Sequence, residues 1–209
     1  MRIYSPLFYK ASSLLCALAL SACSSLAPHA PLPANGDIST HTLTNRLYQQ
    51  QIQISGRITV HYQQNGKEQT LPGSFEWEQD KRVLRITLLS PLGQTLARIT
   101  QSDGNALLEQ DGKAPKQAHD LDQLLSEALG WTLPVGGLRD WLQGFMPNRT
   151  GQRIALTPED QTLQADGWTL RYASWHEAPA FPKRIDLDRY TDEAGNVAIR
   201  IVVDQWKAP

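Results

Sequence analysis

Few residues of this 209-residue chain have the types and spacing that enzymatic chemistry requires. The sequence has no Gly-x-Ser-x-Gly elbow for a nucleophilic serine and no His-Glu-x-x-His motif for a catalytic zinc. Its five histidines are scattered, and none has the spacing of metal ligands. The carboxylate pairs Glu76/Glu78 and Asp186/Asp188 alternate with apolar residues, which is typical of the solvent face of a strand. We therefore expect neither an enzyme nor a metal site.

The residue with the clearest chemistry is Cys23, one of only two cysteines in the chain. The first ten residues carry Arg2 and Lys10 but no acidic residue, and residues 11–20 are mostly apolar. This pattern is typical of a secretory signal peptide, and the run is shorter than the roughly 20 apolar residues that span a bilayer. We predict a signal peptide over residues 1–22, with cleavage before Cys23.

The motif Leu20-Ser21-Ala22-Cys23 resembles the lipobox of bacterial lipoproteins. That resemblance implies a diacylglycerol thioether on Cys23 and an acyl chain on the new amino terminus. Cys16 leaves with the signal peptide, so no disulfide partner remains, which fits lipidation better than a redox or metal role. Ser24 stands where Asp tends to retain such lipoproteins at the inner membrane, so it favours the outer membrane. An ordinary signal peptide followed by a chance cysteine is the alternative.

The rest of the chain divides into a tether and one domain. The net charge of −1 provides no basic excess that would favour nucleic acid. Residues 23–39 begin with the lipidated cysteine and are rich in Pro and Ala, so we predict a flexible tether. Residues 40–209 are long enough for one well-buried domain. A short helix is predicted around Leu43, Leu47 and Tyr48.

Strand patterns dominate this domain. Apolar and polar residues alternate over residues 52–62, and Asn65-Gly66 predicts a hairpin turn into the next strand. Ser90-Pro91-Leu92-Gly93 has Ser, Pro and Gly at the first, second and fourth positions of a β-turn. In all we count about ten to eleven antiparallel strands, the others lying near residues 75–77, 84–88, 95–100, 106–110, 154–157, 163, 168–172, 185–187 and 197–203.

Two segments have helical spacing instead. The first is ended by Gly130 and carries apolar residues three or four positions apart: Leu121, Leu124, Leu125, Ala128 and Leu129. The second follows Pro134, has Leu138 and Trp141 on one face, and is stopped by Gly144 and Pro147. The fold class is therefore mainly β (α+β) with a helical insertion.

These blocks, in this order and spacing, resemble the LolB family of outer-membrane receptors, which accept lipoproteins from the periplasmic carrier LolA. The resemblance covers roughly residues 40–209. It rests on Gly56-Arg57-Ile58, Gly73-Ser74-Phe75-Glu76-Trp77, Leu89-Ser90-Pro91-Leu92-Gly93-Gln94-Thr95, Leu124-Leu125, Leu129-Gly130-Trp131, Leu133-Pro134-Val135 and Leu138-Arg139-Asp140-Trp141-Leu142-Gln143-Gly144. It implies an open antiparallel half-barrel with a helical lid around an apolar cavity.

The resemblance also implies the function and its residues. The protein would face the periplasm from the outer membrane as a lipid-anchored monomer and bind the acyl chains of its cargo without a nucleotide or other cofactor. It would insert the lipoprotein into the inner leaflet of the outer membrane, among phospholipids. The loop Pro91, Leu92 and Gly93 would engage the membrane through Leu92. The turn chemistry alone equally allows Leu92 to fold back on the sheet.

An acyl-binding interior needs apolar residues that line space instead of filling a core. The candidates are Ile58, Phe75, Trp77, Leu84, Ile86, Leu88, Ile99, Leu125, Leu129, Trp131 and Trp141. Plain core packing is the alternative for each of them, because a sequence does not separate a cavity wall from a filled core.

Two other classes of function stay open at this point. Turnover on ester, glycoside or peptide substrates would support an enzyme. A structural or signalling outer-membrane lipoprotein could use the same half-barrel to bind a protein or another lipid, since a fold does not fix a function.

Overall fold

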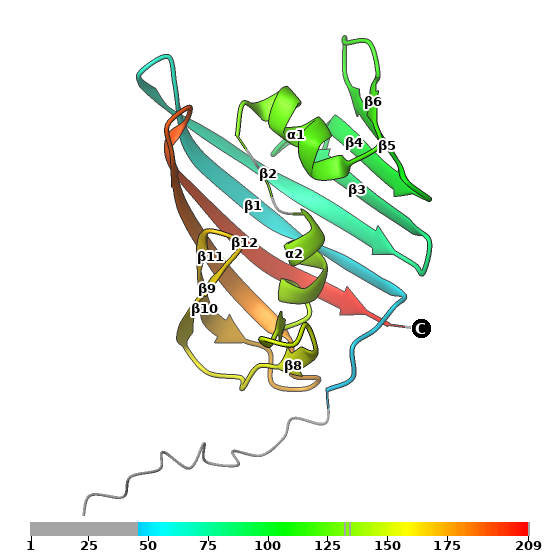
Figure 1. Cartoon of the computed structure of the whole chain (residues 1–209), viewed down its shortest axis with the longest axis vertical. Helices are drawn as coiled ribbons and strands as arrows, with labels where there is room; N and C mark the ends of the chain where they lie inside the picture. The colour runs from blue at the N-terminus through cyan, green and yellow to red at the C-terminus, as the bar shows by residue number, and fades with distance from the viewer. Residues whose placement is uncertain (1–45, 132, 134, 209) are drawn as a thin grey trace, which may run out of the picture. The chain divides into compact units, whose positions relative to one another are not determined.

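The computed structural model describes residues 46–131, 133 and 135–208. Its main element is a ten-stranded antiparallel sheet in the order β6-β5-β4-β3-β2-β1-β12-β11-β10-β9. The outermost strands β6 and β9 do not pair with each other, so the described sheet is open, and helices α1 and α2 lie over one of its faces (Figure 1). The predicted open antiparallel half-barrel with a helical cover is confirmed.

Every strand of the main sheet pairs with its neighbours in antiparallel fashion. The strands are β1 (Ile52–Gln64), β2 (Lys67–Gln79), β3 (Val83–Leu89), β4 (Thr95–Ser102), β5 (Asn105–Gln110), β6 (Lys116–Ala118), β9 (Gln161–Ala165), β10 (Trp168–Trp175), β11 (Pro182–Thr191) and β12 (Gly195–Lys207). Between β6 and β9 the chain forms α1 (Leu121–Leu129), α2 (Val135–Trp141), and the separate two-stranded sheet of β7 (Phe145–Pro147) and β8 (Arg153–Ala155). The short strands β6 and β7 were not predicted, because three residues are too few to show a period of two.

The hairpin of β1 and β2 lies near the middle of the sheet. The two strands pair along their whole length, from Ile52 opposite Gln79 to Gln64 opposite Lys67. At the turn both Asn65 and Gly66 have positive φ angles, of 53° and 72°. A two-residue turn of this kind matches the twist of the flanking strands, so the predicted Asn-Gly hairpin is confirmed.

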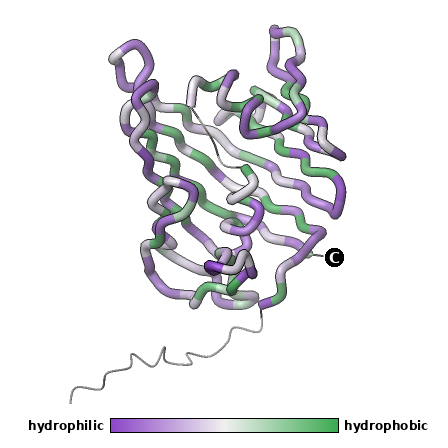
Figure 2. Tube along the Cα trace, in the orientation of Figure 1, coloured by the Kyte–Doolittle hydropathy of each residue, from purple (hydrophilic) through white to green (hydrophobic). Residues whose placement is uncertain are grey.

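Alternation along the strands gives the sheet one apolar face. Hydrophobic and hydrophilic residues alternate visibly along the strands in Figure 2. The buried side chains of one face, such as Ile54, Trp77 and Ile201, belong to a single cluster. The helices add their own apolar side chains to the same cluster: Leu121, Leu124, Leu125, Val135, Leu138 and Trp141. The core therefore lies between one sheet face and the two helices.

The segment before β1 differs from its prediction. Leu43 lies outside the described residues, and the chain at Leu47 and Tyr48 is not helical. The prediction of a helix is wrong for this part, because the backbone of Gln49 bonds to the side chain of Gln143 instead of to its own neighbours.

A glycine permits the close approach of β1 and β12 where their register shifts between Ser55 and Gly56. A Cβ atom on Gly56 would overlap the carbonyl oxygen of Val202 and lie 3.0 Å from Cε1 of Phe75. The overlap is with backbone, which cannot rotate away. Any larger residue at Gly56 must therefore push two paired strands apart.

We predict that Gly56→Ala lowers the free energy of unfolding by about 2–3 kcal/mol, as overpacking in a core does. Gly136→Ala is the matched control, because an added Cβ in α2 meets nothing within 4 Å. The control should leave stability unchanged or raise it by up to about 1 kcal/mol, since alanine favours helix. Urea unfolding measures both, and an unchanged midpoint for Gly56→Ala would contradict this account of the glycine.

Candidate functional site

The predicted acyl-binding residues come together between the sheet and the helices. Eight of them are buried in the single core cluster: Phe75, Trp77, Leu84, Ile86, Ile99, Leu125, Trp131 and Trp141. Ile58 and Leu88 are half-buried and pack against that cluster. These ten residues therefore share one apolar surface, although they come from four strands, both helices and the segment between the helices.

Leu129 is the exception. Its side chain is 39% exposed and does not belong to the cluster. The packed face of α1 is centred on Leu121, Leu124 and Leu125, and the helix ends directly after Leu129, at Gly130 with φ 78°. Helical spacing predicted that Leu129 lines the interior, and this is wrong for the structure because the sheet does not cover the last residue of the helix.

Part of the interior is tightly packed in this structure. Leu84, Leu170, Ile185 and Leu187 expose no surface at all, so no space as large as a water molecule touches them. The predicted apolar cavity is therefore absent beside these four residues, because other side chains of the same cluster pack around them. The apolar surface is present, and the helices cover it.

The two helices of the cover are joined into one unit. Asp120 caps α1 by accepting a hydrogen bond from the backbone N–H of Gln123 at 2.8 Å. Asp122, in the first turn of α1, accepts the N–H of Val135, the first residue of α2, at 3.1 Å. Burial raises the pKa of Asp122 above its usual value, against the opposing effect of hydrogen bonds from the backbone N–H groups of Val135 and Gly136. A movement of α1 therefore pulls on the start of α2.

Sequence reasoning missed a polar cluster at the far end of α2. The buried side-chain amide of Gln143 bonds to the backbone of Gln49, and the guanidinium of Arg46 donates to the carbonyl oxygen of Gly144. The residues lie more than 90 positions apart. No local pattern in the sequence indicates such a pairing.

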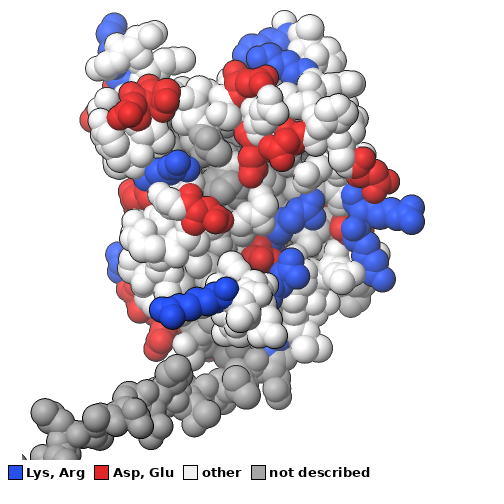
Figure 3. All heavy atoms as spheres, in the orientation of Figure 1, with Lys and Arg blue, Asp and Glu red and all other residues white. Residues whose placement is uncertain are grey.

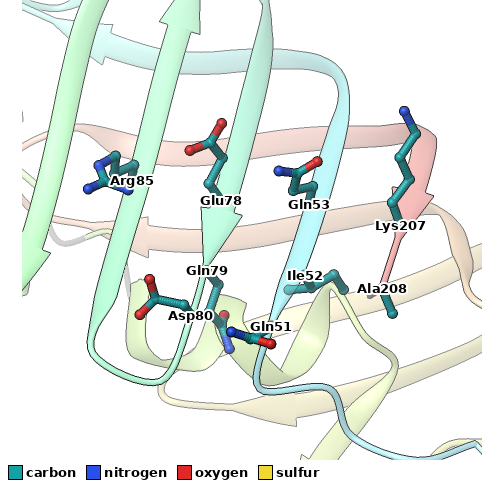
Figure 4. Close-up of a pocket in the computed structure, with 9 residues that line it drawn as sticks. All are labelled: Gln51, Ile52, Gln53, Glu78, Gln79, Asp80, Arg85, Lys207 and Ala208. Carbon is teal, nitrogen blue, oxygen red and sulfur yellow. The ribbon is translucent and has the colours of Figure 1, made fainter.

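Two pockets are lined mostly by polar residues and each touches the edge of the apolar cluster, at Ile52 and at Leu121. One, of about 560 Å³, is lined mainly by polar side chains at the ends of β1, β2 and β12, including Gln53, Glu78 and Lys207 (Figure 4). The other, of about 380 Å³, lies beside the start of α1 and includes Arg82, Asp120 and Arg139. None of the predicted acyl-binding residues lines either pocket, so neither is a candidate for the acyl site.

The turn between β3 and β4 holds an exposed leucine in a defined geometry. The N–H of Gly93 donates to the carbonyl oxygen of Ser90 at 2.9 Å, which confirms the predicted β-turn. The hydroxyl of Ser90 also accepts the N–H groups of Leu92 and Gln94, at 3.3 and 3.2 Å. Leu92 is 88% exposed, so it does not fold back on the sheet. The turn presents one large apolar side chain to its surroundings.

Glu76, Glu78 and Asp188 are exposed, as expected for a solvent face, whereas Asp186 is half-buried. Burial would raise the pKa of Asp186, but hydrogen bonds from Arg184 and Arg200 outweigh it and hold that pKa below its usual value.

Acidic and basic side chains are interspersed over the molecular face in Figure 3. Within the described ranges, no group of His, Cys, Asp or Glu could hold a metal ion.

Fold and site together define an open half-barrel whose apolar face is covered by a helical pair and whose rim carries an exposed leucine. Residues 50–206 match the family model described as outer membrane lipoprotein LolB. The outer-membrane lipoprotein LolB of Cupriavidus pinatubonensis is 39% identical over 204 residues, covering 92% of this chain and 91% of the relative. That of Cupriavidus necator is 39% identical over 191 residues and covers 90% of each chain. The chain therefore belongs to the LolB family of outer-membrane lipoproteins.

A solved structure gives a looser match. The crystal structure of a LolA superfamily protein from Nitrosomonas europaea superposes with a TM-score of 0.42 at 10% identity, covering 78% of this chain and 88% of that one.

In the part of the chain that the structure describes, no helix is both long and apolar enough to cross a membrane. Cys23, with the predicted signal peptide and tether, lies outside the described residues.

Proposed function

We propose that this chain is a monomeric receptor, anchored to the periplasmic face of the outer membrane through lipid on Cys23. It accepts lipoproteins from the carrier LolA and inserts them into the inner leaflet of that membrane. The observation that carries the proposal is the continuous apolar sheet face beneath a two-helix cover, in a chain of the LolB family. A face of this kind can shelter acyl chains once the cover is displaced.

The energetics favour an exchange of apolar partners. Each buried CH₂ group contributes about 0.8 kcal/mol, so three long acyl chains exposed to water would cost on the order of 30 kcal/mol. In the closed structure the leucines of both helices and Trp141 of α2 bury the sheet face. Acyl chains that take their place would bury the same surface. Because one apolar contact replaces another, cargo entry needs no nucleotide.

Release into the membrane needs a different feature. Transfer runs from carrier to receptor to bilayer if each partner binds the acyl chains more tightly than the one before. The exposed side chain of Leu92 can enter the lipid surface and bring the receptor close to it. The short, hydrogen-bonded turn keeps that side chain extended from the sheet, so contact costs little conformational entropy.

Transfer of cargo tests the proposal directly. Carrier loaded with a labelled lipoprotein is mixed with this chain, and the label is followed by separation of the two proteins. We expect the label to move to this chain without ATP. A folded chain that receives no cargo would contradict the proposal and favour a lipoprotein that binds another ligand.

Leu92→Glu should separate acceptance of cargo from its release. The variant should fold normally, because the side chain is exposed, and should take the lipoprotein from the carrier as the wild type does. Release into liposomes should fall at least tenfold, because a charged side chain is costly to place in the lipid surface. Ile154→Glu, at another exposed apolar residue, is the control and should release cargo normally. Normal release by Leu92→Glu would refute the role of the loop.

A further inference from the structure

The segment of residues 46–51, which precedes β1 and which we call the strap, lies against the end of α2 (Figure 1). The N–H of Gln49 donates to Oε1 of Gln143 at 2.9 Å, and Nε2 of Gln143 donates to the carbonyl oxygen of Gln49 at 3.1 Å. One side-chain amide thus satisfies both backbone groups of a strap residue. Because Gln143 is only 1% exposed, separating the two would leave buried polar groups without partners.

Arg46 makes a second set of hydrogen bonds that hold the strap in place. Its guanidinium donates to the carbonyl oxygens of Gly144 and Leu156, both at 2.8 Å, and of Ala180 at 3.2 Å. The same group lies 5.4 Å from the ring centre of Phe145 and 5.0 Å from that of Trp175. Nε of this half-buried cation has no hydrogen-bond partner, so the group depends on these three carbonyl oxygens, which it reaches only while the residues that follow α2 stay in place.

The strap is bonded to the sheet as well as to the end of α2. Nε2 of Gln79, at the end of β2, donates to the hydroxyl of Tyr48 at 3.2 Å. The indole N–H of Trp77 donates to Oε1 of the same glutamine at 3.3 Å. The ring of Tyr48 meets Phe145 edge-on, with 5.6 Å between centres. The strap therefore bridges β2 and the segment after α2.

The first helix is held in a different way. Among the described residues, no hydrogen bond joins α1 itself to the main sheet, and its contact with the core is made by Leu121, Leu124 and Leu125. Its polar link runs to α2, through Asp122. Apolar contacts can be exchanged for acyl chains without loss, whereas buried hydrogen bonds cannot. The two ends of the helical cover thus differ in what it costs to lift them.

We infer that the strap fixes the α2 end of the cover, so that the cover opens at α1 and hinges at α2. Arg46 and Gln143 are then positioning residues that set which half of the apolar face is uncovered first. This inference rests on the proposed function, because binding of acyl chains to the sheet face requires the cover to open. It assigns entry of the chains to the side of α1 and the neighbouring strand β5.

Hydrogen exchange of the wild-type chain, followed by mass spectrometry, tests the hinge. We expect the amides of α1 to exchange at least tenfold faster than those of α2, because α1 opens without breaking the strap. Exchange in α2 as fast as in α1, or faster, would overturn the inference.

Variants of the strap give the second test. Gln143→Leu keeps the size of the side chain but loses its hydrogen bonds, and Arg46→Lys keeps the charge but loses the planar fork. Both should speed exchange in α2 at least tenfold and leave β1 and β12 unchanged. Arg57→Lys is the matched control, at an exposed arginine paired with Asp204. It should change the exchange rates neither of α2 nor of β1 and β12. Unchanged α2 exchange, or an equal rise throughout the sheet, would contradict the inference.

Binding of a fluorescent fatty acid by the same proteins separates the two proposals. Both strap variants should take up the fatty acid at the rate of the wild type, within about twofold, because entry on the side of α1 does not break the contacts of the strap. A wild type that binds no fatty acid would count against the proposed function, while the exchange rates still decide the hinge. Wild-type binding with uptake several-fold faster in the strap variants would contradict the assignment of entry to the side of α1, because the contacts of the strap would then limit entry.

Discussion

Burial of one apolar sheet face is the constraint on which the rest of this structure depends. An open sheet cannot cover its inner face with its own strands, as a closed barrel does, so another element must cover it. Here α1 and α2 do so, and their leucines and Trp141 belong to the same apolar cluster as the sheet face. The interaction is not directional, because it depends on area removed from water and not on particular partners. An apolar surface that helices cover can equally be covered by acyl chains.

Polar contacts determine which parts of the molecule stay fixed while apolar partners change. The amide of Gln143 and the guanidinium of Arg46 hold the end of α2, and the hydroxyl of Ser90 holds the turn that carries Leu92. Breaking the contacts of Gln143 would leave buried groups without partners, whereas the exposed contacts of Ser90 define the shape of the turn. The chain thus combines an exchangeable apolar interior with fixed points at the hinge and at the exposed turn.

Local patterns in the sequence predicted most of the elements. Alternation identified the long strands, Asn65-Gly66 and Ser90-Pro91-Leu92-Gly93 identified two turns, and helical spacing with Gly130 identified α1. The strap escaped prediction, because its conformation depends on partners more than 90 residues away. The packing of the helices against the sheet face could not be predicted for another reason. The same inward-facing residues serve a packed core and an acyl site, so the pattern does not show which state the helices adopt.

The position of bound acyl chains tests the central claim most directly. Trp77, Trp131, Trp141 and Trp168 are buried in the core cluster, so bromine atoms on an acyl chain can quench their fluorescence only from inside it. The chain is titrated with a triacylated lipopeptide whose acyl chains carry bromine, and with the same lipopeptide without bromine. We predict that both bind and that only the brominated form quenches the tryptophan emission strongly and saturably. Equal emission with the two bound lipopeptides would contradict the claim that the apolar sheet face receives the acyl chains.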